Sequence, residues 1–303
     1  MGRTTGIEWT DATWNPIRGC TRVSKGCENC YAERVAARFS GPGLPYEGLA
    51  TIKGGEARWT GKIRFVDEHL ADPLKWKTPM RIFVNSMSDL FHPGVTDDHL
   101  ADIFDVMART QHTFQILTKR PARMKQVLDA AAHPDVARSF ELQYGRKWPP
   151  HEWQFGVSIE DQKTANERLP ILVDCIAAKK IVSYEPALGE VDFELALGGV
   201  GCYLQCAAID WIIAGGESGP NARPVSIHWL RKTRDLCQEI GIPFFFKQWG
   251  EWRAIEGKFD AAMLRKPLPP AMQLSDSPLV YWRFGKSKTG SLLDGVEWKE
   301  FPQ

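Results

Sequence analysis

Short apolar runs recur along the chain about every 30 residues, and a helical stretch follows each one. The runs are rich in β-branched and aromatic residues, and they begin at residues 81, 113, 153, 180, 210 and 243. Runs of this length, bounded by polar residues, are typical of buried strands. Parallel strands need a crossover connection of a dozen or more residues, so this spacing leaves room for one strand and one helix at each step.

The segments between the runs carry the signals of helices. Apolar residues from Leu100 to Met107 recur at helical spacing, which predicts one buried face. Pro121 occupies a plausible first helical position. Ser226 can cap a further helix that Gly241 ends. Helices therefore alternate with the strands along most of the chain.

Repeated alternation of strand and helix predicts a parallel sheet with helices outside it. With six or seven such units and right-handed crossovers, we expect a full or partial (βα) barrel of the TIM type. A doubly wound open sheet is the alternative. A segment near residues 13–17 would supply a further first strand.

Two regions break this rhythm. Residues 135–152 are predicted to be a loop insertion. Residues 251–303 lack the alternation and contain Pro267, Pro269 and Pro270. We therefore expect a barrel domain over residues 1–250, with the cysteine loop near its N-terminus, and a C-terminal appendage over residues 251–303 that packs on the barrel.

The composition is that of an ordinary globular protein, with 43% apolar and 25% charged residues. The 38 basic and 37 acidic side chains leave a net charge of +1. Proteins that bind nucleic acid usually carry a basic excess, because phosphate contacts dominate that affinity. The whole-chain charge therefore does not favour a nucleic-acid partner, although a local basic groove stays open.

The compartment is expected to be the cytoplasm, with no membrane partner. The N-terminus lacks an apolar signal region, and no stretch approaches the roughly 20 apolar residues of a membrane span. The seven cysteines are an odd number and unevenly spread. In a reducing compartment, such cysteines indicate metal binding or catalysis more than disulfides.

The most informative stretch is a loop with the spacing C-x6-C-x2-C, formed by Cys20, Cys27 and Cys30. Gly19 and Gly26 allow the backbone to turn three thiols toward one centre. A helix from Ala32 to Phe39 is predicted to follow, and its N-terminal dipole would stabilise thiolates. Three cysteines can hold a [4Fe–4S] cluster and leave one iron open for a small-molecule ligand.

Two alternatives for this loop stay open. Structural zinc sites have four ligands, so a distant His or Cys would have to close a zinc site here. The thiols could also carry no ligand at all. Among the other cysteines, Cys175 and Cys237 fit a buried core. Cys202 and Cys206 fit either core packing or a second redox pair.

Beside the cysteine loop, seven stretches carry a family resemblance, and they span residues 7–16, 83–92, 117–121, 156–158, 183–186, 215–219 and 244–250. Three clustered cysteines after the first strand of a (βα) barrel resemble the radical-SAM superfamily. Within that group, the chain is most similar to the phage-type three-Cys-motif proteins of unknown function, found in bacteriophages and bacteria. The resemblance covers nearly the whole chain.

The resemblance implies a fold, a cofactor and a reaction. The fold would be a radical-SAM-like barrel. The open iron would bind S-adenosylmethionine (SAM), whose reductive cleavage gives a 5′-deoxyadenosyl radical, and an electron donor would be a partner. The phage association of the family makes a nucleic-acid base or nucleotide a candidate substrate.

Polar side chains follow every predicted strand, so we predict one shared polar cavity at the carboxyl ends of the strands. Carboxylates, hydroxyls and amides there suit the ammonium and ribose groups of a zwitterionic cofactor. The predicted cofactor-binding residues are Tyr31, Asn85, Ser86, Asp89, Ser158, Glu185 and Glu217. The predicted catalytic residues are Lys119, Glu185 and Lys247.

Three functions compete at this stage. The first is a radical-SAM enzyme that acts on an unidentified substrate, and the converging polar groups favour it. The second is a non-catalytic iron–sulfur or zinc protein of phage origin, which could be regulatory. The third is a nucleic-acid-binding phage accessory protein, against which the near-zero net charge counts.

Overall fold

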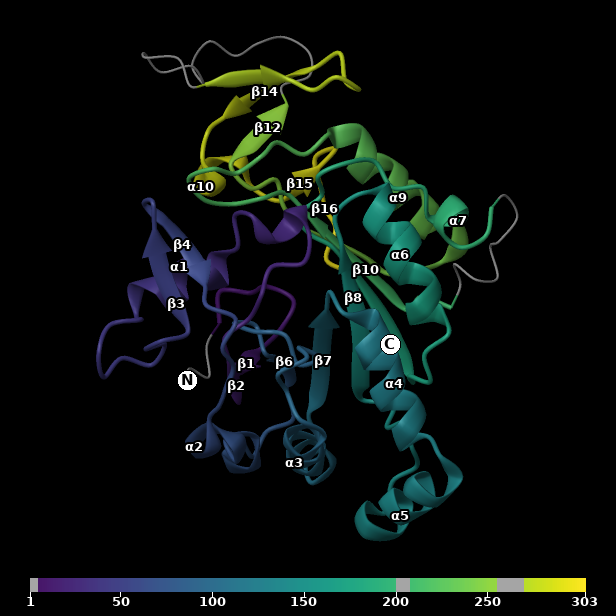
Figure 1. Cartoon of the computed structure of the whole chain (residues 1–303). Coiled ribbons are helices and arrows are strands. Elements are labelled where there is room, and N and C mark those ends of the chain that lie inside the picture. The colour runs from purple at the N-terminus through teal and green to yellow at the C-terminus, as the bar shows by residue number, and fades with distance from the viewer. Residues whose placement is uncertain (1–4, 200–207, 255–269) are drawn as a thin grey trace. The chain divides into compact units, whose positions relative to one another are not determined.

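The computed structural model describes residues 5–199, 208–254 and 270–303. It is a mixed α/β protein built on a seven-stranded sheet with the strand order β1-β6-β7-β8-β9-β10-β11 (Figure 1). The order is linear, with β1 and β11 as the two edges, and the sheet is a parallel curled half-barrel. The expectation of a partial barrel built from strand–helix units is confirmed at this level.

All six strands predicted from the apolar runs are present, and the segment near residue 13 adds the first. Their bounds are β1 (Ala12–Trp14), β6 (Arg81–Val84), β7 (Thr113–Thr118), β8 (Trp153–Ile159), β9 (Lys179–Tyr184), β10 (Trp211–Gly215) and β11 (Phe244–Gln248). The register is parallel where β1 pairs with β6, β6 with β7, β7 with β8, and β10 with β11.

The chain divides into two compact units, which are described separately. Unit 1 comprises residues 1–157 and 168–181, and unit 2 comprises residues 158–167 and 182–303. The helix α6 (Gln162–Val173) contributes residues to both. The boundary expected at residue 250 stays a prediction.

Unit 1 holds the cysteine loop. Its helices are α1 (Tyr31–Arg38), α2 (Asp67–Leu70), α3 (Asp97–Ala108), α4 (Pro121–Ala131) and α5 (Pro134–Tyr144), with short 3-10 turns η1 (Lys25–Cys27) and η2 (Pro73–Lys75). Two small antiparallel pairs add to it, β2 (Ile17–Arg18) with β5 (Arg64–Phe65) and β3 (Ala50–Lys53) with β4 (Glu56–Trp59). As predicted, Pro121 is the first residue of α4.

The prediction of a loop over residues 135–152 is wrong, because the first half of this segment belongs to the helix α5. Pro134 lies at the first helical turn, and Gly145 ends the helix in the left-handed conformation with φ 66°. The ring of Phe140 packs against Trp148 and Trp153, at centroid distances of 5.4 and 6.0 Å. These aromatic contacts stabilise a helix whose sequence periodicity is weak.

Unit 2 contains α7 (Phe193–Ala196), α9 (Ile227–Ile240) and the C-terminal segment. Ser226 caps α9 and Gly241 ends it, as predicted. The C-terminal segment forms an antiparallel sheet in the order β12 (Trp252–Ala254), β14 (Val280–Arg283), β13 (Ala271–Gln273), then α10 (Lys286–Thr289) and a hairpin of β15 (Leu292–Leu293) and β16 (Val296–Glu297).

The last residues of the chain run beside β11 within unit 2. The backbone N–H of Phe246 donates to the Trp298 carbonyl at 2.9 Å, and the Trp211 indole N–H donates to the Glu300 carbonyl at 2.9 Å. The C-terminal segment therefore packs on the β10–β11 strands through backbone and indole hydrogen bonds.

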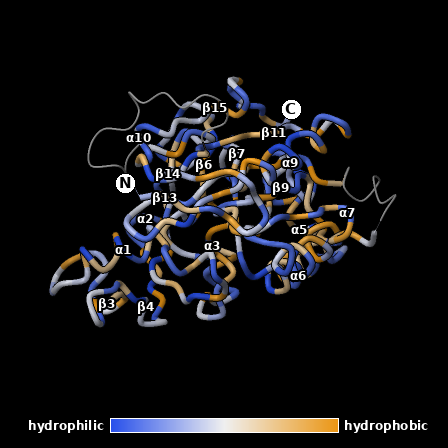
Figure 2. The backbone as a smooth tube through the Cα atoms, turned by 90° about the horizontal axis from the view of Figure 1, so that it is seen from above, coloured by the Kyte–Doolittle hydropathy of each residue, from blue (hydrophilic) through white to orange (hydrophobic). Residues whose placement is uncertain are grey.

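Large side chains of the strands form the buried core. Trp14, Trp153, Trp211 and Phe244 are fully buried, and so is Phe114. Hydrophobic stretches alternate with hydrophilic ones along the backbone tube in Figure 2. Cys175 and Cys237 are buried as predicted, although Cys175 lies two residues beyond the end of α6. Cys202 and Cys206 lie outside the described residues.

In the three described ranges, every helix is too short or too polar to cross a membrane.

Candidate functional site

The cysteine loop lies in unit 1 between β2 and α1. Cys27 ends the turn η1, and Cys30 is the N-cap residue of α1. Gly19 begins the loop with φ 95°, and a Cβ there would lie 2.1 Å from the Lys62 carbonyl oxygen. Only glycine fits this position, so the close backbone approach fixes where the loop starts.

The three thiols are free and lie close enough to influence one another electrostatically. Burial raises the pKa of Cys20 to about 12, with smaller contributions in the same direction from Asp89, Cys30 and Cys27. Burial also raises the pKa of Cys30, and the backbone N–H groups of Glu33 and Ala32 oppose that shift. The Cys30 side chain makes no capping hydrogen bond to α1, so the expected stabilisation of thiolates by the dipole of this helix stays a prediction.

Two arginines bring positive charge to the three sulfurs. The charge of Arg120 acts on the Cys20 thiol, and its Nη2 donates to the Thr21 carbonyl and hydroxyl oxygens at 3.0 and 2.7 Å. Arg22 interacts electrostatically with Cys27 and Cys30. Arg22 is itself held by Glu33, a nearly fully buried carboxylate on α1, through its Nε at 2.9 Å.

The donor set fits a thiolate-bound metal group in its chemistry. Over the described ranges, no three His, Cys, Asp or Glu side chains already stand together as metal ligands. The three free thiols nevertheless share one short loop, and each is influenced by a second thiol or an arginine. Backbone N–H donors and cations beside the sulfurs are what an anionic iron–sulfur group requires.

His92 is a candidate for a fourth ligand because it contacts Thr21, the residue after Cys20, but both of its ring nitrogens are already used. Its Nδ1 accepts from the Gly94 N–H at 3.0 Å, so the proton of the neutral ring lies on Nε2, which is 2.9 Å from the Thr21 hydroxyl. Burial, and then the charge of Arg120, lower the pKa of His92. A zinc site closed by His92 would therefore have to break these hydrogen bonds.

Asp89 was predicted to bind the cofactor. In the structure it is a buried carboxylate of unit 1 that accepts several hydrogen bonds. Its Oδ1 accepts from the Thr118 hydroxyl at 2.7 Å and the Phe91 N–H at 3.0 Å. Its Oδ2 accepts from the Lys119 N–H at 3.2 Å and from Arg120 Nη1 at 2.7 Å. With four donors on two oxygens, Asp89 holds the loop after β7 and positions Arg120 beside Cys20.

The other predicted residues of unit 1 lie around the segment after β6. The Tyr31 hydroxyl donates to the Ser86 carbonyl at 2.5 Å, so two of the predicted residues meet there. Asn85 has φ 58° and is 3% exposed, and its Nδ2 is buried with no hydrogen-bond partner in the described part of the chain. Lys119, a predicted catalytic residue, is partly buried beside Asp89.

In unit 2, Glu185 and Lys247 form the pair that the sequence assigned to catalysis. Lys247 Nζ lies 2.8 Å from Glu185 Oε1, and the two side chains are 21% and 14% exposed. A Cβ on Gly215 would lie 3.1 Å from Glu185 Oε1, and one on Gly216 would lie 2.0 Å from the Trp249 carbonyl oxygen. Gly215 therefore lets the backbone pass close to Glu185, whereas Gly216 lets it pass close to the backbone of Trp249.

Glu217, the second predicted cofactor ligand of unit 2, is held by Arg223. The guanidinium donates from Nε to one carboxylate oxygen at 2.9 Å and from Nη2 to the other at 2.7 Å, and the Arg223 N–H adds a third bond at 2.8 Å. Gln248 Nε2 donates to the Ser218 hydroxyl at 2.9 Å. Ser158 is half-buried near the end of β8.

The predicted site residues thus form two groups, one in each unit. The cysteines, Tyr31, Ser86 and Asp89 belong to unit 1, and Glu185, Lys247 and Glu217 belong to unit 2. Sequence analysis missed Arg22 and Glu33, which hold positive charge at the cysteine loop. The sequence shows only an acidic residue three positions after Cys30, and its burial beside Arg22 is seen in the structure alone.

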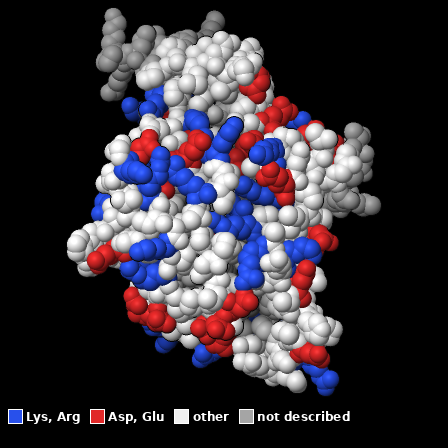
Figure 3. All heavy atoms as spheres, viewed as in Figure 1, with Lys and Arg blue, Asp and Glu red and all other residues white. Residues whose placement is uncertain are grey.

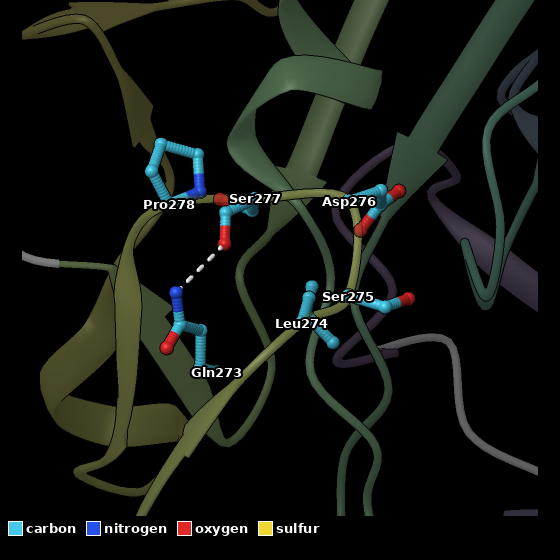
Figure 4. Close-up of a pocket in the computed structure, with 6 residues that line it drawn as sticks. All are labelled: Gln273, Leu274, Ser275, Asp276, Ser277 and Pro278. Carbon is cyan, nitrogen blue, oxygen red and sulfur yellow. Dashed lines mark hydrogen bonds between the residues drawn. The ribbon is translucent and has the colours of Figure 1, made fainter.

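Two hollows lie away from these residues. One, of about 500 Å³, is lined by apolar side chains of α3, α4 and α5 that include Leu100, Phe104 and Phe140. The other, of about 660 Å³, lies at the exposed turn from Gln273 to Pro278, where Gln273 Nε2 donates to the Ser277 carbonyl at 3.4 Å (Figure 4). Neither hollow contains a predicted site residue.

The fold and site define an α/β half-barrel protein with a three-cysteine loop after its first strand. The model of the family described as "Protein of unknown function (DUF5131)" matches residues 4–302, and the chain belongs to this family. The comparison with curated proteins found no match, and the comparison with solved structures found none either.

Proposed function

We propose that the protein is a radical-SAM-type enzyme whose [4Fe–4S] cluster is held by Cys20, Cys27 and Cys30. One observation carries the proposal. Three free thiols in one loop lie within electrostatic range of one another, and the positive charges of Arg120 and Arg22 act on them. Hydrogen bonds and cations at the sulfurs are the means by which proteins hold and tune such clusters.

The number of thiols supports an open iron. Three cysteine ligands leave one iron of a [4Fe–4S] cluster without a protein ligand. His92, the neighbouring candidate for a fourth ligand, has both ring nitrogens in hydrogen bonds. With SAM bound, such a cluster supplies one-electron reductive cleavage of a carbon–sulfur bond, while the protein orients the reactants and excludes water.

The chain's own residues would then share the work of binding. Asn85 Nδ2 is a buried donor without a partner in the described ranges, and the Tyr31 ring lies at the start of α1 beside the cysteine loop. Glu185 has Lys247 as its single ion-pair partner in the same ranges, so its second oxygen can accept from a ribose hydroxyl or an ammonium group. Asp89 and Glu217 instead have structural roles, because their oxygens are already occupied.

The finer parts of the proposal go with the reaction class. The half-barrel would be the radical-SAM-like variety of the TIM fold, and the protein would work in the cytoplasm with an electron donor. Its substrate is unidentified, with a nucleic-acid base or nucleotide as the candidate. A phage origin for the chain is likewise part of the proposal.

The test is anaerobic reconstitution with iron and sulfide, followed by incubation with SAM and dithionite. We expect about four irons per chain and slow release of 5′-deoxyadenosine. Cys27→Ala should lose both, whereas the matched control Cys237→Ala, at a buried cysteine of α9, should keep both. If the wild-type protein takes up iron yet neither binds nor cleaves SAM, the proposal of a radical-SAM-type enzyme is refuted.

A non-catalytic iron–sulfur or zinc protein is the second candidate. One observation favours it, since two of the carboxylates predicted to bind the cofactor, Asp89 and Glu217, are committed to internal arginines. One zinc per chain with no uptake of iron would establish this alternative.

A further inference from the structure

Residues 18–64 form a small module of unit 1 with a core of its own. Here they are called the basic module, and they comprise the cysteine loop, α1 and the β3–β4 hairpin. Ala36 and Ala37 of α1 pack with Tyr46, Leu49 and Ala50, and Trp59 of β4 covers them. The module holds its surface residues on packed elements and not on a loose tail.

The basic module carries an excess of positive charge that the whole chain lacks. It contains nine Lys and Arg against four Glu, a net charge of +5, so the remaining residues sum to −4 in a chain of net charge +1. Two of the nine are neutralised within the module, because Arg22 pairs with Glu33 and Arg58 pairs with Glu56. Five of the others are exposed, namely Lys25, Arg38, Lys53, Lys62 and Arg64.

The basic module also carries exposed aromatic rings. Of all Phe, Tyr and Trp side chains in the described ranges, the exposed ones are Tyr31 and Phe39, at 49% and 43%. Both belong to α1 or its C-cap, eight positions apart, which corresponds to about 12 Å along a helix. On the face shown in Figure 3, Lys and Arg lie over the region that α1, β3 and β4 occupy in Figure 1 and across the middle of the face, with some Asp and Glu among them.

We propose that the basic module binds single-stranded nucleic acid. Clustered cations attract a phosphate backbone, and exposed rings beside them provide stacking surfaces for unpaired bases. An acidic peptide would use the cations alone and leave the exposed rings without a role. The binding stands without any cluster, whereas the further idea that the bound strand is the substrate rests on the proposed function, because Tyr31 directly follows Cys30.

The test is fluorescence anisotropy with the full-length protein and a labelled RNA or DNA strand of about 20 nucleotides, enough to span a typical binding site. The same sequence as a duplex is the comparison. Salt is varied between about 50 and 200 mM, because counterion release makes phosphate binding salt-dependent. We expect binding to the single strand that weakens with salt and exceeds binding to the duplex.

Two variants assign that binding to the module. The triple variant Arg38→Glu, Lys53→Glu, Lys62→Glu should weaken it at least about tenfold and reduce the salt slope by about 2, for three lost phosphate contacts. The matched control is Lys163→Glu, Lys286→Glu, Lys288→Glu, three exposed lysines of unit 2 with the same change in net charge. The control should keep the affinity within about twofold, since its charges lie outside the module.

Phe39→Ala separates stacking from charge, because it leaves every cation in place. It should weaken single-strand binding about tenfold, as the loss of one stacked base would, with the duplex little affected. Equal losses in the module and control variants would overturn the proposal, and so would equal affinity for polyglutamate or for anionic lipid vesicles. No binding at the lowest salt would overturn it as well, while the iron measurements would be unaffected.

Discussion

Asp89 in unit 1 and Glu185 in unit 2 occupy equivalent positions in the sequence pattern, yet the structure uses them differently. Each follows a predicted strand, and each was predicted to bind a cofactor. Asp89 accepts from four donors and is 6% exposed. Glu185 has one ion-pair partner in the described ranges, Lys247, and lies against Gly215.

The difference separates a structural carboxylate from one with capacity for a ligand. A carboxylate with two hydrogen bonds at each oxygen has few lone pairs left for a ligand, and its removal leaves a buried arginine without a partner. A carboxylate with one partner keeps lone pairs for a ligand. Polar residues at strand ends should therefore be ranked by how many internal donors they already satisfy.

The largest expected effect is the loss of bound iron when a cysteine of the cysteine loop is removed. Cys27→Ala removes one of three thiolates and should reduce bound iron after reconstitution from about four per chain to background. Iron and sulfide assays measure it. Iron retained in this variant would show that other residues hold the metal, and Cys237→Ala controls for the loss of a thiol.

The next effect contrasts the two carboxylates directly. Asp89→Ala should lower the free energy of unfolding by about 3–5 kcal/mol, because it leaves Arg120 buried without its partner. Glu185→Ala should cost at most about 2 kcal/mol, since Lys247 is partly exposed. Urea denaturation of the metal-free protein measures both free energies of unfolding. Equal losses in the two variants would show that Asp89 and Glu185 do not differ in their structural role.

Removing the charge of Glu185 should weaken ligand binding. Glu185→Gln keeps the size of the side chain but removes its charge, and should weaken SAM binding to the reconstituted protein about tenfold, the loss of one charge-assisted hydrogen bond. Asp276→Asn, at the exposed turn of unit 2, is the control for the loss of one carboxylate. Unchanged affinity in Glu185→Gln would remove Glu185 from the site.

The smallest effect concerns His92, next to the Asp89–Arg120 pair. Burial and the charge of Arg120 lower the pKa of this imidazole, so the folded protein favours its neutral form. The resulting stability is fully present above the ordinary histidine pKa of about 6.5 and is lost as the pH falls through the lowered value. Denaturation at about pH 7.5 and about pH 5.5, on either side of the ordinary histidine pKa, should show less acid destabilisation in His92→Gln than in the wild type.

The sheet was predictable because each of its strands is an apolar run that ends in a polar residue. The helix α5 was not, because its stability depends on the packing of Phe140 on Trp148 and Trp153, and the sequence pattern does not show that these side chains meet. The β3–β4 hairpin was also missed, although Gly54 and Gly55 mark its turn with positive φ angles.

The candidate site shows the same limit. The three cysteines could be chosen from their spacing, because all three lie in one loop. The sequence could not predict whether Asp89 would bind Arg120 or a ligand. The two residues are 31 positions apart and come together only after β6 and β7 pair. Spacing predicts which groups lie at the carboxyl ends of strands, and only the structure shows which of them are satisfied by each other.

The central claim is a three-thiolate cluster with one open iron, and electron paramagnetic resonance of the reduced, reconstituted protein tests it most directly. Spectra are recorded before and after SAM is added. The account predicts a [4Fe–4S] signal that SAM changes, because it binds the iron that lacks a protein ligand. A signal that SAM leaves unchanged, or a protein that binds one zinc and no iron, would contradict it.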